Sequence, residues 1–276
     1  MDTPLLFEAD AQHPVVKRFV EKYQFYRIEH PCYLKTVPNG RMECWKIFSG
    51  GFEIWDDAKS SFQAAPATGG YPATHNSLLF RIREQLFCLN IKLRLNAILA
   101  PAFEKFYPLN LSITPLESKE IDDLEEISMA DFFDGYAISS TILDRWILDL
   151  FSAVLENKEL ETLIQLLGTP EVQTVAQLAA ALQLNAKALH RKTKRYFDLS
   201  PKELLSIFRF ERTAAYLKSD FANRLTDALQ FGYYDQSHFN KESKRITGFS
   251  PRQLFERMSL TTHDLMVFEV EPDSIV

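Results

Sequence analysis

The sequence contains few of the features that mark secreted, membrane-spanning or disulfide-stabilised proteins. Only three of its 276 residues are cysteine, and Cys32, Cys44 and Cys88 show no paired spacing, which argues against a disulfide framework and favours a reducing compartment. No run approaches the roughly 18 apolar residues that a membrane-spanning helix needs. The first residues, MDTPLLFEADAQHP, lack a basic start followed by an apolar core, so no secretory signal is predicted. We therefore expect a cytoplasmic protein without a membrane partner.

Motifs for catalysis and metal binding are also missing. The six histidines are scattered, and the patterns HxH, HExxH and CxxC do not occur. No nucleophile elbow, phosphate-binding loop or dinucleotide-binding fingerprint is found either. We therefore expect no catalytic residues, no bound metal and no cofactor.

Charge is distributed unevenly along the chain. The net charge is −6, yet residues 170–258 contain 15 Lys and Arg against 9 Asp and Glu, which makes this segment basic. Residues 1–169 are acidic, and the tail from residue 259 has four acidic residues and no basic ones. A basic C-terminal module on an acidic body is a common arrangement in nucleic-acid-binding proteins.

The first 138 residues have the pattern of a mixed, strand-rich and possibly barrel-like domain. In LFCLNIKLRLN, apolar residues at 89, 91, 93 and 95 alternate with polar ones, which predicts one buried and one wet face. MECWKIF and FEIW flank Gly50-Gly51 and could form a hairpin. Residues 62–76 are loop-like in composition, and residues 13–29 are helical or mixed. The nearby aromatic residues fit core packing or an apolar pocket: Trp45, Phe48, Phe52 and Trp55.

From about Ser139 the apolar period changes to that of a helix. Apolar residues follow at three- and four-residue spacing: Ile142, Leu143, Trp146, Ile147, Leu150, Phe151, Val154 and Leu155. Packing on its own domain is the simpler interpretation of this segment. A connector between domains or a dimer contact over residues 139–158 is the alternative, and LENKELE, residues 155–161, is the predicted domain boundary.

The C-terminal part contains an internal repeat. KALHRKTKRYFDLSPKELL and SHFNKESKRITGFSPRQLF align at an offset of 50 residues. Leu189 then matches Phe239, the Lys-Arg pair at 194–195 matches that at 244–245, and each copy ends in Ser-Pro. A helical bundle with solvated basic faces would explain the charge of these helices, but it explains the recurrence of the pattern poorly.

Each copy of the repeat contains signals for two helices joined by a tight turn. A short helix, VAQLAAAL or LTDALQF, comes first, and Thr174 with Gln177 fits a capping box for the first of them. Asn185 and Asp235 are predicted N-caps of the second helices, near 186–196 and 235–246. Ser200-Pro201 and Ser250-Pro251, each followed by Glu or Gln, predict that a new helix begins there.

Helix, tight turn and second helix is the helix-turn-helix plan, in which the second helix lies in the major groove of DNA. The side chains predicted to read bases are Lys187, His190 and Arg191 in the first copy, and Gln236, Ser237, Asn240 and Lys241 in the second. Those predicted to contact the DNA backbone are Lys194, Arg195, Lys244 and Arg245. Leu189 and Phe239 are expected to face inward.

The segment from Pro201 to about Ser219 is predicted to be a helix that joins the two copies. About 19 residues at 1.5 Å each span about 28 Å. Neighbouring major-groove segments on one face of a duplex lie about 34 Å apart. A connector of this length is therefore consistent with one chain reading two adjacent segments.

At these residues the sequence resembles the AraC/XylS family of bacterial transcriptional regulators, over about residues 159–258. GYYDQSHFNKESKRITGFSPRQLF is similar to the family signature G-F/Y-x-D-x-S-H-F followed by K-R-x-x-G-x-S-P, and SPKELLSIFRFERTAAYL is similar to the family's linker helix. A fainter likeness to sensor regions of relatives involves PNG at 38–40 and the strand near Leu89.

The resemblance implies a regulator that binds double-stranded promoter DNA through two helix-turn-helix units. It also implies an α+β chain with a sensor or regulatory domain at 1–138, a DNA-binding domain at 159–258 and an acidic tail at 259–276. A small-molecule effector, a second copy of the chain and, for an activator, RNA polymerase are the further expected partners. The alternative is a metal- or ligand-dependent barrel enzyme tethered to a DNA-binding module, although His13, His30 and His75 lack the spacing of metal ligands.

Four positions depart from the family pattern. Thr193 and Ser243 stand where the family usually has Phe, a loss worth about 3–5 kcal/mol if the ring were simply deleted. Tyr196, Phe197 or Ile246 are the candidates to compensate for it. Asp198 replaces the turn glycine of the first copy, which Asp tolerates because it visits left-handed conformations more readily than most residues. Asp227 stands at a usually buried position, or one residue is missing there.

Overall fold

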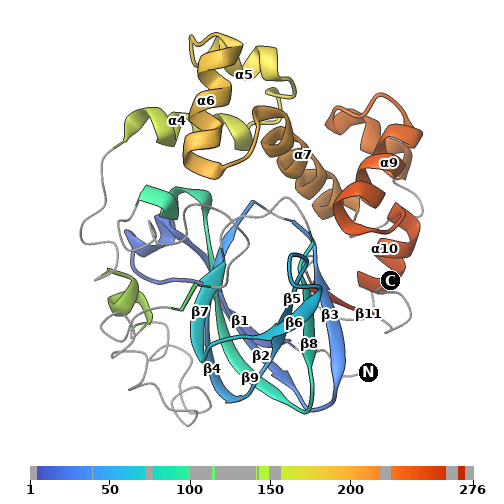
Figure 1. Ribbon diagram of the computed structural model, residues 1–276. Coiled ribbons are helices and arrows are strands. Elements are labelled where there is room, and N and C mark those ends of the chain that lie inside the picture. The colour runs from blue at the N-terminus through green and yellow to red at the C-terminus, as the bar shows by residue number, and fades with distance from the viewer. Residues whose placement is uncertain are drawn as a thin grey trace.

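The computed structural model describes residues 5–38, 40–71, 77–99, 114–115, 141, 143–148, 157–217, 225–258 and 267–270. They form a strand-rich N-terminal part and a helical C-terminal part, which is drawn above the strands in Figure 1. The predicted α+β organisation is confirmed. Within the described residues, no helix combines the length and the apolar character needed to cross a membrane.

Two antiparallel sheets make up the strand-rich part. Sheet A has the strand order β1 (Leu5–Ala9), β2 (Val20–Ile28), β9 (Leu86–Leu93), β4 (Met42–Gly50), β7 (Thr68–Tyr71) and β10 (Thr114–Pro115). Sheet B has the order β11 (Val267–Val270), β3 (Cys32–Thr36), β8 (Leu79–Ile82), β5 (Glu53–Asp56) and β6 (Ser61–Ala64). Two short 3-10 helices flank strands of sheet A, η1 (Val16–Arg18) and η2 (Leu95–Leu99). The described strands form two open sheets that face each other. They do not close into the barrel that the sequence had suggested as a possibility.

The core of the strand-rich part lies between the sheets and continues on the far side of sheet A. Between the sheets, one buried cluster joins residues of both: Tyr26, Ile28, Cys32, Leu34, Trp45, Phe52, Ile54, Ile82, Leu86 and Cys88. On the other face of sheet A, Leu143, Trp146 and Ile147 from the helical residues 143–148 pack against Phe25 and Leu89. The predicted packing of this helix on its own domain is thus observed for residues 143–148, and residues 139–140, 142 and 149–156 of the predicted connector lie outside the described residues.

Strand β9 is buried along its whole length because sheet A is covered on both faces. The alternation in LNIKL predicted a wet face, and that prediction is wrong. Asn90 borders the space between the sheets, and Lys92 forms a salt bridge with Glu21 of β2 at 3.9 Å. Polar residues on this face therefore have partners inside the protein rather than in water.

The predicted hairpin around Gly50-Gly51 is also wrong. Strand β4 pairs with β7 and β9, whereas β5 pairs with β6 and β8, so the two glycines carry the chain from sheet A to sheet B. Gly50 has a φ of 72°, and an added Cβ would lie 1.9 Å from the carbonyl oxygen of Gln85, so only glycine fits. Residues 62–64 and 68–71 are strands rather than loop. Residues 13–29, predicted to be helical or mixed, are mixed: the 3-10 helix η1 is followed by strand β2.

The helical part follows the predicted order closely. Its elements are α4 (Lys158–Gly168), α5 (Val175–Ala181), α6 (Ala186–Phe197), α7 (Pro201–Leu217), the 3-10 helix η5 (Leu225–Phe231), α9 (Gln236–Thr247) and α10 (Pro251–Met258). The capping box of Thr174 and Gln177 is confirmed. Ser200 with Glu203, and Ser250 with Gln253, make the reciprocal hydrogen bonds predicted for the starts of α7 and α10.

The end of the chain returns to the strand-rich part. Residues 267–270, predicted to belong to an acidic tail, form β11 and pair with β3 at the edge of sheet B. Val270 and Val37 belong to the same buried cluster as Phe239 and Ile246 of α9. The hydroxyl of Ser77 donates a hydrogen bond to the carbonyl oxygen of Ile246 at 2.9 Å. The second half of the helical part is therefore docked on sheet B.

Candidate nucleic-acid interface and cavity

Helix α6 presents one buried and one exposed face. Its N-cap, Asn185, accepts a hydrogen bond from the backbone N–H of Ala188 at 2.8 Å, as predicted. Leu189, Thr193 and Phe197 face the core. All five predicted DNA contacts of the first copy are exposed: Lys187, His190, Arg191, Lys194 and Arg195. The Lys194 ammonium bonds the carbonyl oxygen of Asp198 at 2.6 Å, so it lies against the end of its own helix.

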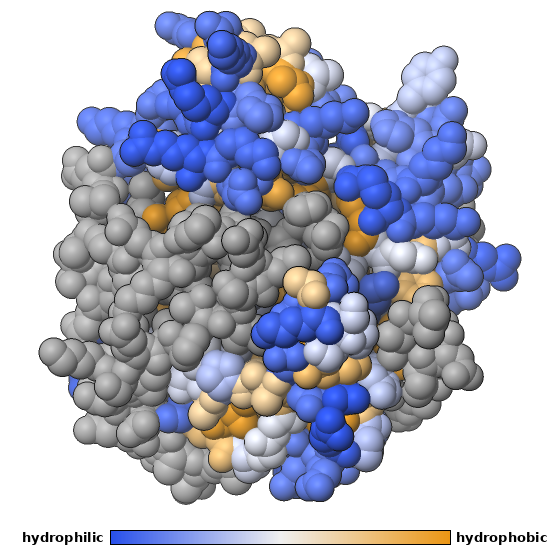
Figure 2. Space-filling model, viewed as in Figure 1, coloured by the Kyte–Doolittle hydropathy of each residue, from blue (hydrophilic) through white to orange (hydrophobic). Residues whose placement is uncertain are grey.

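Helix α9 repeats this arrangement. Its N-cap, Asp235, accepts from the backbone N–H of His238 at 2.7 Å, and Phe239 is fully buried. Of the predicted DNA contacts, Gln236, Ser237, Lys241, Lys244 and Arg245 are exposed and Asn240 is half-buried. The guanidinium of Arg245 donates to the Ser206 hydroxyl at 2.7 Å, which draws it toward α7. Hydrophilic residues predominate over the region of α6 and α9 (Figure 2).

The two residues that replace the family's Phe are fully buried, and both have hydrogen-bond partners. The Thr193 hydroxyl donates to the carbonyl oxygen of His190 at 3.1 Å, and the Ser243 hydroxyl donates to that of Phe249 at 2.9 Å. Phe197 and Ile246, two of the predicted compensating residues, are buried nearby on the same helices. Small hydroxyl residues are thus accommodated without an unpaired polar group.

The turns around the recognition helices show why two other departures are tolerated. Asp198 is left-handed with a φ of 49°, as predicted, and Gly248 has a φ of 83° at the equivalent position. Asp227 is not buried. It is exposed on η5, where it accepts a hydrogen bond from the Tyr216 hydroxyl at 2.9 Å. The first helix of the second unit is a 3-10 helix rather than an α-helix.

Helix α7 joins the two units and contributes to both. Its 17 residues span about 26 Å at 1.5 Å each. The Arg209 guanidinium makes two hydrogen bonds to the Glu242 carboxylate, at 3.1 and 2.6 Å, and Glu242 also accepts from the Tyr233 hydroxyl at 2.9 Å. No local sequence pattern signals this group, because Arg209 and Glu242 are 33 residues apart and belong to different helices. Burial, together with the Glu242 charge, raises the pKa of Tyr233, so its hydroxyl remains a donor.

A groove of about 700 Å³ separates the two units on the side of α7. Its lining includes the cationic residues Lys202, Arg209, Lys241 and Arg245 together with Thr174 and His238. Two of these, Lys241 and Arg245, are predicted DNA contacts. These two residues of α9 therefore border a groove that α7 and the start of α5 complete, and whose lining also includes Glu203 and Glu242.

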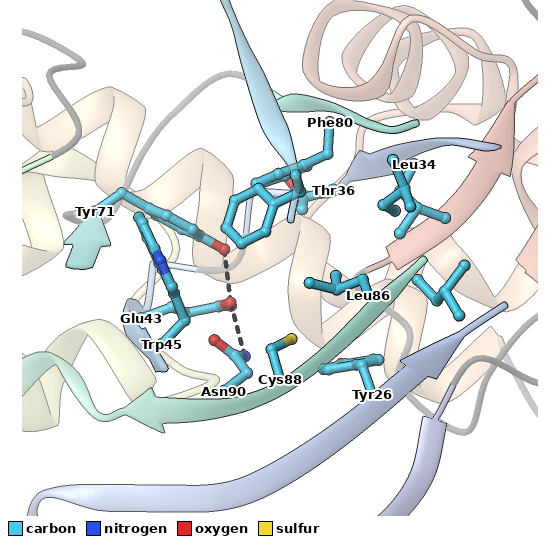
Figure 3. A pocket seen from close by; sticks show the side chains of 13 residues that line it. Tyr26, Leu34, Thr36, Glu43, Trp45, Tyr71, Phe80, Leu86, Cys88 and Asn90 are labelled. Carbon is cyan, nitrogen blue, oxygen red and sulfur yellow. Dashed lines mark hydrogen bonds between the residues drawn. The ribbon is translucent and has the colours of Figure 1, made fainter. Parts of the chain in front are cut away.

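A cavity of about 80 Å³ lies between sheets A and B. It is lined by Tyr26, Ile28, Leu34, Thr36, Glu43, Trp45, Phe52, Tyr71, Phe80, Ile82, Leu86, Cys88 and Asn90 (Figure 3). Of the four aromatic residues singled out in the sequence, Trp45 and Phe52 border the cavity, whereas Phe48 packs near Phe87. Burial raises the pKa of the Cys88 thiol to about 12, so Cys88 is a protonated, apolar part of the wall.

An ionic cluster connects sheet A to α7. Arg41, just before β4, forms salt bridges with Glu21 of β2 and with Glu211 of α7, the latter at 2.9 Å. Burial raises the pKa of Glu211, while at Glu21 the charges of Arg41 and Lys92 outweigh burial and lower the pKa. No sequence motif signals this cluster, because its three elements are far apart in the chain. It ties the strand-rich part to the helix that joins the two units.

Comparison with protein families supports the helix-turn-helix interpretation. Residues 178–257 match a family model described as a helix-turn-helix domain. The match covers both repeated units, and the resemblance to AraC/XylS regulators is confirmed for this part of the chain. No curated protein matches the sequence.

Solved structures with a similar fold include two of ToxT from Vibrio cholerae. ToxT from strain O395 aligns with a TM-score of 0.52 at 12% identity, covering 87% of this chain and 98% of that chain. Wild-type ToxT from strain SCE256, solved with a bound unsaturated fatty acid, aligns with a TM-score of 0.51 at 11% identity, covering 87% and 97%. At this identity the likeness shows a shared two-part fold. Family match and fold together support a DNA-binding transcription regulator.

Proposed function

We propose that this chain is a sequence-specific regulator of the AraC type that reads two adjacent major-groove segments with helices α6 and α9. One observation carries the proposal. Two capped helices, fifty residues apart in sequence, each bury an apolar anchor and expose polar and basic side chains at equivalent positions. Packing within a helical bundle would explain the buried anchors, but it would not explain why the exposed polar and basic positions recur.

Within this proposal the exposed side chains take two roles. Lys187, His190 and Arg191 of α6, and Gln236, Ser237, Asn240 and Lys241 of α9, read base edges in the major groove. Lys194, Arg195, Lys244 and Arg245 contact phosphates and set the register of each helix. Lys202 of α7, which lines the groove beside α9 together with Lys241 and Arg245, is a further backbone contact in this proposal.

The proposal also assigns a role to each part of the chain. Residues 1–138 form the regulatory domain, 139–158 the connector and 159–258 the DNA-binding domain, while residues 267–270 of the tail dock on sheet B. The cavity between the sheets is the proposed effector site, because it is a mainly apolar pocket bordered by both sheets of the regulatory domain. The fatty acid in one ToxT structure supports a small molecule as the class of ligand. Dimerisation, and contact with RNA polymerase for an activator, are consistent with the family resemblance.

A gel-shift series tests the base-reading residues. A genomic fragment selected by the purified protein serves as the probe, with scrambled DNA for comparison. Arg191→Ala and Asn240→Ala should each weaken binding to the selected fragment by about 1–3 kcal/mol, because each removes a base contact. Binding of the unchanged protein should fall steeply as salt rises, because phosphate contacts release counterions.

Arg252→Ala is the matched control, because Arg252 is an exposed arginine of α10 that pairs with Glu256 and lies outside both recognition helices. Its affinity for the selected fragment should stay close to that of the unchanged protein. If Arg191→Ala and Asn240→Ala bind that fragment as tightly as Arg252→Ala does, the assignment of α6 and α9 as reading helices is wrong.

A further inference from the structure

The space inside the cavity between the sheets is small. Its volume is about 80 Å³, whereas a buried apolar cavity of about 150 Å³ holds a benzene molecule. Aromatic and aliphatic side chains from both sheets form most of its wall, among them Trp45, Phe52, Phe80 and Leu86. The space therefore suits a compact ligand of a few heavy atoms, most of which are apolar.

Three polar side chains of the wall, Glu43, Tyr71 and Asn90, are joined by hydrogen bonds. The carboxylate of Glu43 accepts a hydrogen bond from the Tyr71 hydroxyl at 2.6 Å and another from the Asn90 amide at 3.0 Å. Figure 3 shows these three side chains meeting beside Trp45 and Cys88. Asn90 also donates to the side-chain oxygen of Gln24 at 3.3 Å. Two donors directed at one carboxylate oxygen match the hydrogen-bonding of an ionised carboxylate.

The charge at the wall of this cavity is negative. Among the residues that line it, Glu43 is the one with an ionisable acidic side chain, and no Lys, Arg or His is included. The charge of Glu43 also acts on Arg41, whose guanidinium forms salt bridges with Glu21 and Glu211, and Lys92 forms a salt bridge with Glu21. A ligand carboxylate placed beside Glu43 would meet a like charge in a low-dielectric space, which is costly.

We propose that the cavity binds a compact, largely apolar molecule that carries a hydrogen-bond-donating group, an amine in preference to an alcohol, and that Glu43 accepts from that group. This inference rests on the proposed role of the cavity as the effector site and names the chemical class of its ligand. The apolar wall holds the body of the molecule through burial. Glu43 orients it and selects against carboxylic acids of the same shape.

Three probes of one carbon skeleton test the class: isobutylamine, isobutanol and isobutyrate. Binding is measured on the full chain by ligand-observed NMR and by thermal shift at millimolar ligand, because so few atoms limit the affinity that any of them can reach. We expect isobutylamine to bind most tightly and isobutanol more weakly. Isobutyrate should not bind at concentrations that saturate the amine site.

Two matched Glu→Gln variants test whether Glu43 is the residue that selects the amine. Glu43→Gln should raise the dissociation constant of isobutylamine at least tenfold, since the charge is lost while the shape is kept. Glu29→Gln should leave it unchanged, because Glu29 is an exposed residue paired with Arg27 and does not line the cavity. Circular dichroism confirms that both variants are folded.

Three results would overturn the inference: isobutyrate binding as tightly as the amine, equal amine affinity in both Gln variants, or no probe bound by the unchanged protein. None of them bears on DNA recognition, which the gel shift measures without ligand. A failed gel shift, conversely, would leave the probe measurements interpretable. The two proposals can therefore fail separately.

Discussion

Lys192 of α6 and Glu242 of α9 occupy equivalent positions in the repeat, yet the structure uses them differently. Lys192 pairs with Glu159 of α4, whose side chain is 55% exposed. Glu242 is 8% exposed and is held by Arg209 of α7, itself 15% exposed, and by Tyr233. The first unit is thus supported mainly by apolar packing against α4, and the second by a buried ionic group as well.

The two units also pack against different parts of the strand-rich domain. Leu95 of η2 packs with the core of the first unit, whereas the second unit shares its core with Val37 and with Val270 of β11. The outer faces of α6 and α9 nevertheless both carry polar and basic residues at equivalent positions, and the Lys-Arg pair at 194–195 recurs at 244–245. The two units therefore share their helix caps and an exposed polar and basic face, while the inner support of each unit is built from different contacts.

The largest expected difference between the units concerns this support. Glu242→Ala leaves the Arg209 charge buried without its carboxylate partner and should lower the free energy of unfolding by about 3–5 kcal/mol. Lys192→Ala breaks a pair in which Lys192 is 16% exposed but its partner Glu159 is 55% exposed, so Glu159 can be solvated and the loss should be smaller, about 1 kcal/mol. Chemical denaturation of both variants measures the difference.

A double variant, Arg209→Met with Glu242→Leu, is the control for that comparison. Replacing both charges by apolar groups of similar size should recover most of the stability, because a buried ion pair gains little over apolar packing. Equal losses for Glu242→Ala and Lys192→Ala would show that the two units are supported in the same way after all.

A smaller difference is expected at the helix C-caps. Gly248→Ala places a Cβ at a φ of 83° and should cost about 1–2 kcal/mol, while the nearest atom it meets is the flexible Lys35 ammonium at 2.9 Å. Asp198→Gly should change stability by less than about 0.5 kcal/mol, because relief of the left-handed strain is offset by the entropy that glycine adds to the unfolded chain. Thermal unfolding of the two variants gives both values, and a destabilising Asp198→Gly as large as Gly248→Ala would contradict this account.

The N-caps should show almost no difference between the units. Asn185→Ala and Asp235→Ala each remove one side-chain acceptor from an exposed helix start and should each cost about 1 kcal/mol. Asn185→Ser and Asp235→Ser, which keep an acceptor, should stay within a few tenths of a kcal/mol of the unchanged protein. If the two Ala variants lose markedly different amounts of stability, one of the two caps also affects the packing of its unit against the strand-rich domain.

The helical half could be predicted in detail because its signals are local. Caps at Thr174, Asn185 and Asp235, the proline starts of α7 and α10, and the anchors Leu189 and Phe239 each follow from a few neighbouring residues. The first helix of the second unit was less well predicted. LTDALQF has an apolar pattern, but it forms a 3-10 helix with Asp227 exposed.

The strand-rich half was predicted only in outline. The sequence indicated strands but paired them wrongly at Gly50-Gly51, since neighbouring strands in the chain belong to different sheets. It also placed Asn90 and Lys92 in water, because alternation cannot reveal that a second layer covers the polar face. The cavity was anticipated through Trp45 and Phe52, but Glu43, which sets its proposed selectivity, was not among the residues singled out.

By itself the sequence determined the helix boundaries of the DNA-binding part, the repeated polar and basic face and the α+β order of the chain. These depend on interactions within one or two helical turns, and such interactions are encoded in adjacent residues. Only the tertiary structure decided that Glu21, Arg41 and Glu211 form one ionic cluster, that Glu242 is buried and that β11 closes on sheet B. Each of these joins segments that are distant in sequence, so its free energy arises only once the whole chain has folded around it.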